Sequence, residues 1–262
     1  MPKRMWLYDE GTAPTLDCDE VARYVARTVG GIEPGGRGEF ITHWLPGGGE
    51  SVEALALRIA RLKVRSPTVR ASDAEPLAGE IAFERRRLEN GNCGPFGVVY
   101  DGFRFAALLA GVLGSREPDA IHVAFTNRLL ATWQDDDLRY HLRTIICGAP
   151  SLISTSGLVE APAKRREFYA ARQALGEAGT GAGYEVLKQQ FAGRFLDHDD
   201  ARLTEVAKGY ALQAVAYHLT GEPFCDDPRC RLYNAHWQEE MLATQLGGEV
   251  CERHRAVLQP GR

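Results

Sequence analysis

The sequence predicts an α/β fold, and three observations carry this prediction. Short runs rich in β-branched and aromatic residues alternate with amphipathic helical patterns over the first part of the chain. Longer helical patterns follow and fill most of the C-terminal part. The chain has 262 residues, 44% of them hydrophobic and 25% charged, which is typical of a globular protein with a full apolar core.

The first part of the chain contains four expected strands and three expected helices. The strands are the runs at residues 5–9, 38–45, 95–103 and 120–127. The helices are the patterns at 19–30, which stops at Gly30, at 51–63, where Ser51 is a good N-cap, and at 104–114. The β-branched segments 143–148 and 151–160 lie close together and predict a hairpin or a pair of edge strands.

The second part of the chain is expected to be mainly helical. The helical patterns cover residues 166–178, 201–221 and 234–247, and the glycine-rich run 179–183 predicts a flexible break. The longest pattern has Gly221 as its natural stop. We therefore expect an α/β part at 1–178 and a helical C-terminal lobe at 184–262, joined in one continuous domain.

Charge and hydropathy exclude some partners. The formal net charge is -4, so no general attraction to nucleic acid or to an anionic membrane is expected. No apolar stretch approaches the ~20 residues of a membrane span. Asp9 and Glu10 interrupt any signal-like run at the start of the sequence. We expect a cytoplasmic protein, and the sequence gives no indication of its oligomeric state.

Three of the six cysteines gather near the C-terminal end, together with a histidine. Cys225, Cys230, Cys251 and His254 follow the spacing C-x4-C-x20-C-x2-H. Two closely spaced ligand pairs, joined by a spacer long enough for a helix, are typical of a tetrahedral structural zinc site. Such a site has four protein ligands and no open position, so it stabilises and does not catalyse. The alternative is three buried free cysteines and a surface histidine.

The order of features around these cysteines resembles the archaemetzincins. These are zinc peptidases in which the catalytic motif HExxHxxGxxH leads directly into a cysteine of a second, structural zinc site. The resemblance covers roughly the C-terminal half and includes SLISTSGLV at 151–159, which is similar to the family's strand beside the active-site helix. It implies a zincin-like fold: a mixed, twisted sheet, a long active-site-type helix under it, and a zinc-stapled helical C-terminal lobe.

The catalytic motif of that family is largely missing from this sequence. With Gly221 and Cys225 aligned to the motif, His218 takes the place of the second histidine. The first histidine, the catalytic glutamate and the third histidine correspond to Ala214, Val215 and Phe224. In the family motif the histidines hold Zn²⁺ and the glutamate takes a proton from the metal-bound water. The standard peptidase mechanism therefore cannot operate here.

A metal site could have been rebuilt from polar residues nearby. Glu222 follows His218 by four positions, and His236 and Glu240 are four apart on the helix expected at 234–247. We expect these four side chains to converge on one cleft, as catalytic residues around a second metal ion. The alternative is that His218 is a hydrogen-bonded core residue and that His236 and Glu240 form a solvated pair.

Cys93 offers a different chemistry. It lies between glycines in a polar loop and could act as a nucleophile, with His122 or His141 as its base. No local motif supports this reading, and the alternative is an inert cysteine.

Two functions therefore stay open at the level of sequence. The first is a metallopeptidase-related hydrolase with a rebuilt zinc site. The second is a non-catalytic zinc-stapled binding or scaffolding module, with a peptide or small molecule in a cleft lined by Tyr210, Gln213 and Tyr217. Two zinc ions per chain would favour the hydrolase, and one would favour the module.

Overall fold

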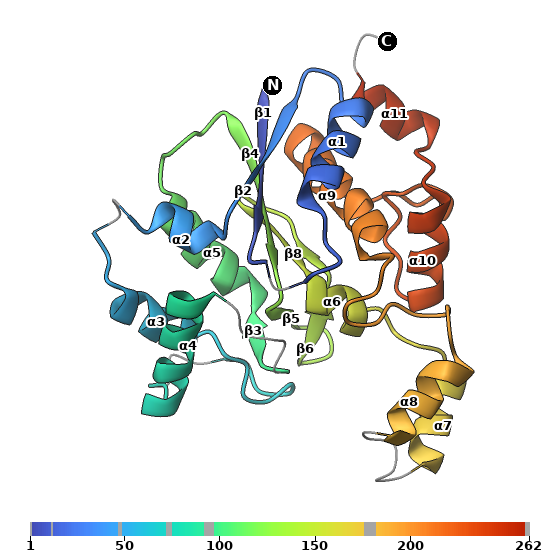
Figure 1. Cartoon of the computed structure of the whole chain (residues 1–262), viewed down its shortest axis with the longest axis horizontal. Coiled ribbons are helices and arrows are strands. Elements are labelled where there is room, and N and C mark those ends of the chain that lie inside the picture. The colour runs from blue at the N-terminus through green and yellow to red at the C-terminus, as the bar shows by residue number, and fades with distance from the viewer. Residues whose placement is uncertain are drawn as a thin grey trace.

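The computed structural model describes residues 2–11, 13–46, 49–71, 75–91, 97–175 and 182–259. Its main sheet has five strands in the order β2-β1-β4-β8-β7 (Figure 1). These strands are β1 (Arg4–Asp9), β2 (Glu33–Arg37), β4 (Ala120–Thr126), β7 (Ile145–Ile146) and β8 (Ser151–Ser154). The first four in the sheet order run parallel, and β7 pairs antiparallel with β8 at one edge.

A smaller sheet lies beside the main one. It has the order β3-β5-β6 and consists of β3 (Val99–Asp101), β5 (Leu129–Gln134) and β6 (Arg139–Arg143). Strand β3 is parallel to β5, whereas β5 and β6 are antiparallel neighbours. Because β5 directly follows β4 in the chain, the two sheets meet at the carboxyl end of the parallel strands.

Helices cover both faces of the main sheet. One face packs against α1 (Cys18–Thr28), α9 (Leu203–Thr220), α10 (Gln238–Gly247) and α11 (Glu252–Leu258). The other face packs against α2 (Phe40–Trp44), α3 (Val52–Ala60), α4 (Ala78–Asn90) and α5 (Gly102–Leu113). Side chains along β1 point alternately to the two faces of the sheet. Leu7 therefore packs in the first core, on the side of α1 and α9, and Tyr8 packs in the second core, on the side of α2 to α5. The first core draws on residues from Met5 to Leu258, so it includes both ends of the described chain.

Helix α9 is the central helix of the C-terminal part. Its residues from Val206 to Ala216 are buried around the whole circumference, because α1, α10, α11 and the strands β4 and β8 all contact it. Gly209 leaves room on α9 for two neighbouring side chains. A Cβ atom there would overlap the side chains of Gln245 and Arg231, so both would have to shift if any larger residue took its place. The residues after α9 are thereby held against the core.

The mixed α/β class is confirmed, as are the helix expected at 19–30, the strands at 5–9 and 120–127, and the long helix that ends at Gly221. The strand expected at 38–45 is wrong, because Phe40–Trp44 is helix α2, whose first turn is capped by the Glu39 carboxylate accepting from the Thr42 N–H. Segment 151–160 is a strand only as far as Ser154. Its second half is α6 (Thr155–Glu160), capped by the Ser154 hydroxyl.

Other elements were not predicted. They are β2, α4, β5, β6 and α11, together with α8 (Ala182–Gln190), which pairs with α7 (Arg166–Ala174) in a small separate cluster of aromatic residues. The flexible break expected at 179–183 lies mostly outside the described residues. No helix in the described ranges is both long and apolar enough to cross a membrane.

Candidate metal centre

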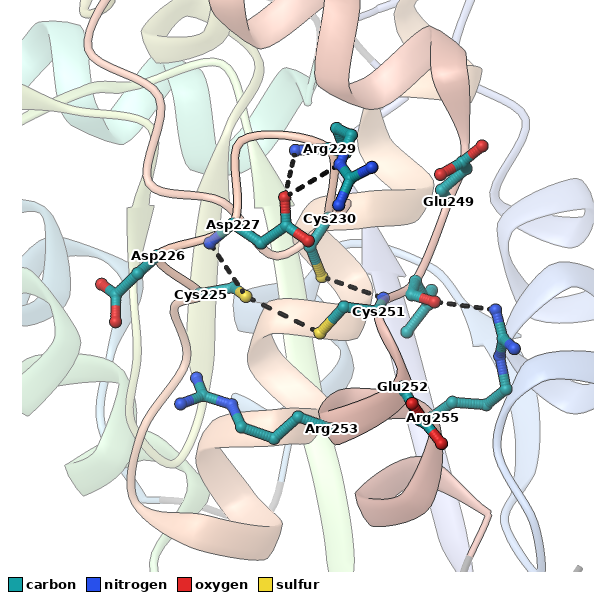
Figure 2. Close-up of a pocket in the computed structure, with 11 residues that line it drawn as sticks. Cys225, Asp226, Asp227, Arg229, Cys230, Glu249, Cys251, Glu252, Arg253 and Arg255 are labelled. Carbon is teal, nitrogen blue, oxygen red and sulfur yellow. Dashed lines mark hydrogen bonds and ion pairs between the residues drawn. The ribbon is translucent and has the colours of Figure 1, made fainter.

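Three cysteines and one histidine meet where the loop after α9 contacts the start of α11. The possible ligand atoms of Cys225, Cys230, Cys251 and His254 all lie within 4.8 Å of one another. Figure 2 shows the three sulfur atoms directed toward a common centre. Cys225, Cys230 and His254 are buried, and Cys251 is half-buried. Among the residues that the structure describes, these four are the group of three or more possible ligand side chains that lie close enough together to hold a metal ion.

Local backbone structure positions each ligand. Gly221 adopts a left-handed conformation, with φ at 80°, and ends α9 four positions before Cys225. The Cys225 N–H donates to the Leu232 carbonyl at 2.9 Å, which closes the loop that carries Cys230. Cys251 is the residue that precedes α11, so His254 lies one turn away on that helix. Both short ligand pairs are therefore formed by single turns of the chain.

The distances between donor atoms fit a tetrahedral ion. The Sγ atoms of Cys225 and Cys251 are 3.8 Å apart, and the Cys230 Sγ is 3.8 Å from Nδ1 of His254. With zinc–sulfur bonds of about 2.3 Å, tetrahedral geometry places two sulfurs about 3.8 Å apart. A disulfide would need the sulfurs at about 2.05 Å. The Cys251 Sγ and the His254 Nδ1 are somewhat closer to each other, at 3.1 Å. The donor set and its spacing therefore fit zinc.

The electrostatics around the sulfurs also suit a cation. Backbone N–H groups of Asp227 and Cys251 donate to the sulfurs of Cys225 and Cys230 at 3.4 and 3.5 Å. Burial raises the pKa of the Cys230 thiol to about 12. Burial acts on Cys251 in the same direction, but the His254 backbone and the neighbouring thiols outweigh it and lower its pKa. A divalent cation would supply the charge that allows all three sulfurs to ionise.

His254 is prepared to act as a neutral ligand. Burial lowers the pKa of its imidazole, and the nearby Arg253 guanidinium acts in the same direction. The neutral ring is the form that binds metal, and its Nδ1 is the nitrogen directed at the cysteines. The ring therefore needs no deprotonation near neutral pH before it can bind.

The four residues expected around a rebuilt site lie in different surroundings. His218 is hydrogen-bonded to the backbone of Gly148, and its pKa is lowered by burial. Glu222 is exposed on the loop after α9. Glu240 accepts from the backbone N–H groups of His236 and Trp237, each at 3.3 Å, and so caps α10. In the described part of the chain, no three of these four form a group of metal ligands.

A cleft of about 710 Å³ lies beside the end of α9. The edge strand β7, Tyr217, Phe224 and His236 contribute to its lining. Tyr210 and Gln213, expected to line such a cleft with Tyr217, are instead buried in the core. Ala214 and Val215 are fully buried as well, so the two positions that the resemblance assigns to a zinc ligand and the general base only pack against other core residues.

The alternative cysteine site centres on Cys93 with His122 or His141 as its base. Cys93 itself lies outside them. His122 hydrogen-bonds the Tyr8 hydroxyl at 2.8 Å, and His141 pairs with the Asp137 carboxylate at 2.6 Å.

Sequence reasoning missed a second group of charged residues, at the carboxyl ends of β1 and β4. Glu10 directly follows β1, and Arg128 follows β4. Their charged groups are buried, and Arg128 donates to Glu10 at 2.8 Å. The signal in the sequence was polar residues placed directly after two expected strands, since parallel strands bring such residues to the same edge of a sheet.

Comparisons with known proteins agree with a metallopeptidase relationship. No curated protein and no solved structure matches the chain. A family model described as "Probable metallopeptidase family (DUF6775)" matches residues 1–260, which is nearly the whole chain. The chain belongs to this probable metallopeptidase family.

Proposed function

We propose that Cys225, Cys230, Cys251 and His254 hold one structural zinc ion, and that the protein binds a ligand in the cleft beside α9 without hydrolysing it. The observation that carries this proposal is the tetrahedral spacing of the four donor atoms, all within 4.8 Å of one another. A zinc-stapled, zincin-like member of the family that resembles the archaemetzincins would fit both this spacing and the order of the motifs.

The zinc ion would hold the C-terminal lobe to the rest of the chain. It would cross-link the loop after α9 to the start of α11, through two ligands from each segment. The same loop carries Phe224, which lines the cleft immediately before Cys225. Rigid support of this kind is what a precise binding site on a loop requires. The zinc site would therefore stabilise the cleft as well as the fold.

The residues at the positions of the family's catalytic motif disfavour hydrolysis. A metal-assisted peptidase needs an ion with an open position and a base that takes a proton from water. Ala214 and Val215 offer neither group, and Glu240 is occupied in capping α10. The only grouped ligands among the described residues already number four, which fills a tetrahedral site. The binding module is therefore supported better than the rebuilt hydrolase.

The expected result of a cleavage assay is negative. Zinc-loaded protein incubated with a mixture of general peptides should release no fragments above the level of a no-protein sample, as measured by mass spectrometry. Val215 cannot take a proton from water, so we expect rates at the background level. A His218→Ala variant should behave like the wild type, because His218 is not grouped with other possible metal ligands among the described residues.

Cleavage that is abolished by a chelator and by His218→Ala would show that a rebuilt metal site operates. Chelator-sensitive cleavage that survives His218→Ala would contradict the alignment on Gly221 and Cys225. Either outcome would overturn the binding-module proposal.

A further inference from the structure

A cavity of about 280 Å³ lies at the carboxyl edge of the main sheet, away from the cysteine cluster. In the sheet order β2-β1-β4-β8, the chain passes from β1 to β2 on one side and then to β4 on the other side of β1, so the topological switch point lies between β1 and β4. In open parallel sheets, ligands bind outside the carboxyl ends of the strands at this switch point. The cavity is lined by Asn127 and Arg128, which follow β4, and by Ser156 of α6, which follows β8. Arg128 connects it to the switch point, because it pairs with Glu10 after β1.

The polar wall of the cavity contains two buried guanidinium groups. Arg87 from α4 is 7% exposed and Arg128 is 3% exposed, and both line the cavity. Arg87 donates to Glu10 at 3.2 Å, and Arg128 donates to Glu10 at 2.8 Å and to Glu84 at 3.4 Å. The Nε of Arg128 has no hydrogen-bond partner among the described residues. Arg87 also donates to the Asn127 side chain, so Arg128 is the guanidinium with an unused donor.

The buried ion pairs form one connected group. Three cations, Lys63, Arg87 and Arg128, surround the two carboxylates of Glu10 and Glu84. Glu39 is a third carboxyl near Glu10 and Arg128, and burial raises its pKa. Buried ion pairs of this kind contribute little net stability compared with apolar packing, so their presence at a switch point indicates binding.

The opposite wall differs in character. The His198 imidazole lies 3.7 Å from the Glu160 carboxylate, and its hydrogen bond lowers the pKa of the Glu160 carboxyl. Val98, Leu129 and Leu142 add an apolar surface to the same cavity. An acid on this wall disfavours a doubly charged phosphate and favours a ligand that also carries an amine. The volume lies just below the ~300 Å³ at which drug-sized sites begin, so the ligand is small.

We propose that this cavity binds a small zwitterion with an apolar side chain, of the size of a free amino acid. Its carboxylate contacts Arg87 and Arg128, since guanidinium groups match planar carboxylates. Its ammonium group contacts Glu160, and its side chain contacts Val98, Leu129 and Leu142. This site is separate from the proposed zinc site, and none of the residues that line it belongs to the zinc ligands.

Isothermal titration calorimetry of the zinc-loaded full chain tests this proposal with four probes. These are L-leucine, 4-methylpentanoate, which lacks the amine, 3-methylbutylamine, which lacks the carboxylate, and inorganic phosphate. We expect leucine to bind best, and each single-ended analogue to bind about 10- to 100-fold more weakly, because each loses hydrogen bonds to a charged group. Phosphate should bind more weakly than leucine.

Variants assign the two ends of the ligand. Arg87→Gln should weaken leucine and 4-methylpentanoate by about 10-fold or more and leave the amine unchanged. Glu160→Gln should weaken leucine and leave 4-methylpentanoate unchanged. Arg85→Gln is the matched control, since Arg85 is on the same helix with a side chain 48% exposed, and it should bind all probes like the wild type.

Three outcomes would overturn the proposal. They are no leucine binding to the wild type at millimolar concentration, phosphate binding more tightly than leucine, and leucine binding to Arg87→Gln or Glu160→Gln as to the wild type. If circular dichroism shows that Arg87→Gln does not fold, Glu160→Gln decides, because its side chain is 44% exposed and tolerates the change.

Discussion

Cys251→Ser is expected to release the zinc ion and to lower the free energy of unfolding by about 4 kcal/mol or more, since structural zinc contributes folding free energy directly. Cys225→Ser should have the same effect, because its sulfur is 3.8 Å from that of Cys251 and both complete the ligand set. The segment from the loop after α9 to α11 should lose its protection from hydrogen exchange first. Elemental analysis and thermal unfolding of each purified variant measure these effects.

Cys147→Ser is the matched control for this experiment. Cys147 is also a free cysteine of intermediate burial, but it lies by the cleft and outside the ligand group. It should keep the zinc content and nearly all of the stability of the wild type. Unchanged metal content and unchanged melting temperature in both Cys225→Ser and Cys251→Ser would show that the cluster does not hold zinc.

Glu84→Gln is expected to cost about 3–5 kcal/mol of stability, because it leaves buried cations without their counter-charge. Glu84 is fully buried and accepts from the Tyr100 hydroxyl at 2.6 Å. Its carboxylate also pairs with Lys63 at 3.2 Å and with Arg128 at 3.4 Å. Urea denaturation at neutral pH measures the change in the free energy of unfolding.

Glu89→Gln gives the comparison on the same helix. Its side chain is 47% exposed and pairs only loosely with Arg85 at 3.9 Å, so the expected change is within about 0.5 kcal/mol. Equal stabilities for Glu84→Gln and Glu89→Gln would mean that the buried charges at the sheet edge are not interdependent.

The sequence identified the C-terminal ligand group well because its information is local. Cysteine spacing, a helix stop at Gly221 and a spacer between Cys230 and Cys251 that is long enough for a helix are all properties of short segments. Long periodic segments were equally clear, and the helix now seen as α9 was expected to end where it does. The segment Phe40–Trp44 misled because its aromatic and β-branched residues favour a strand, whereas the Glu39 cap and burial against the second core favour a helix.

Features that depend on strand order could not be read from the sequence. Glu10 and Arg128 are 118 positions apart, and they meet only because β4 lies directly beside β1. In the same way, the spacing of four residues predicted that Glu240 lies near His236. It did not predict that Glu240 accepts hydrogen bonds from the backbone at the start of α10. Pairing of distant strands decides which side chains share a site, and local patterns do not record it.

A zinc count on protein purified without added metal tests the central claim most directly. Elemental analysis should find one zinc ion per chain, and X-ray absorption at the zinc edge should show three sulfur ligands and one nitrogen ligand, as Cys225, Cys230, Cys251 and His254 provide. No zinc, or an ion without sulfur ligands, would contradict the structural site. Two zinc ions per chain would contradict the non-catalytic module and restore the rebuilt hydrolase.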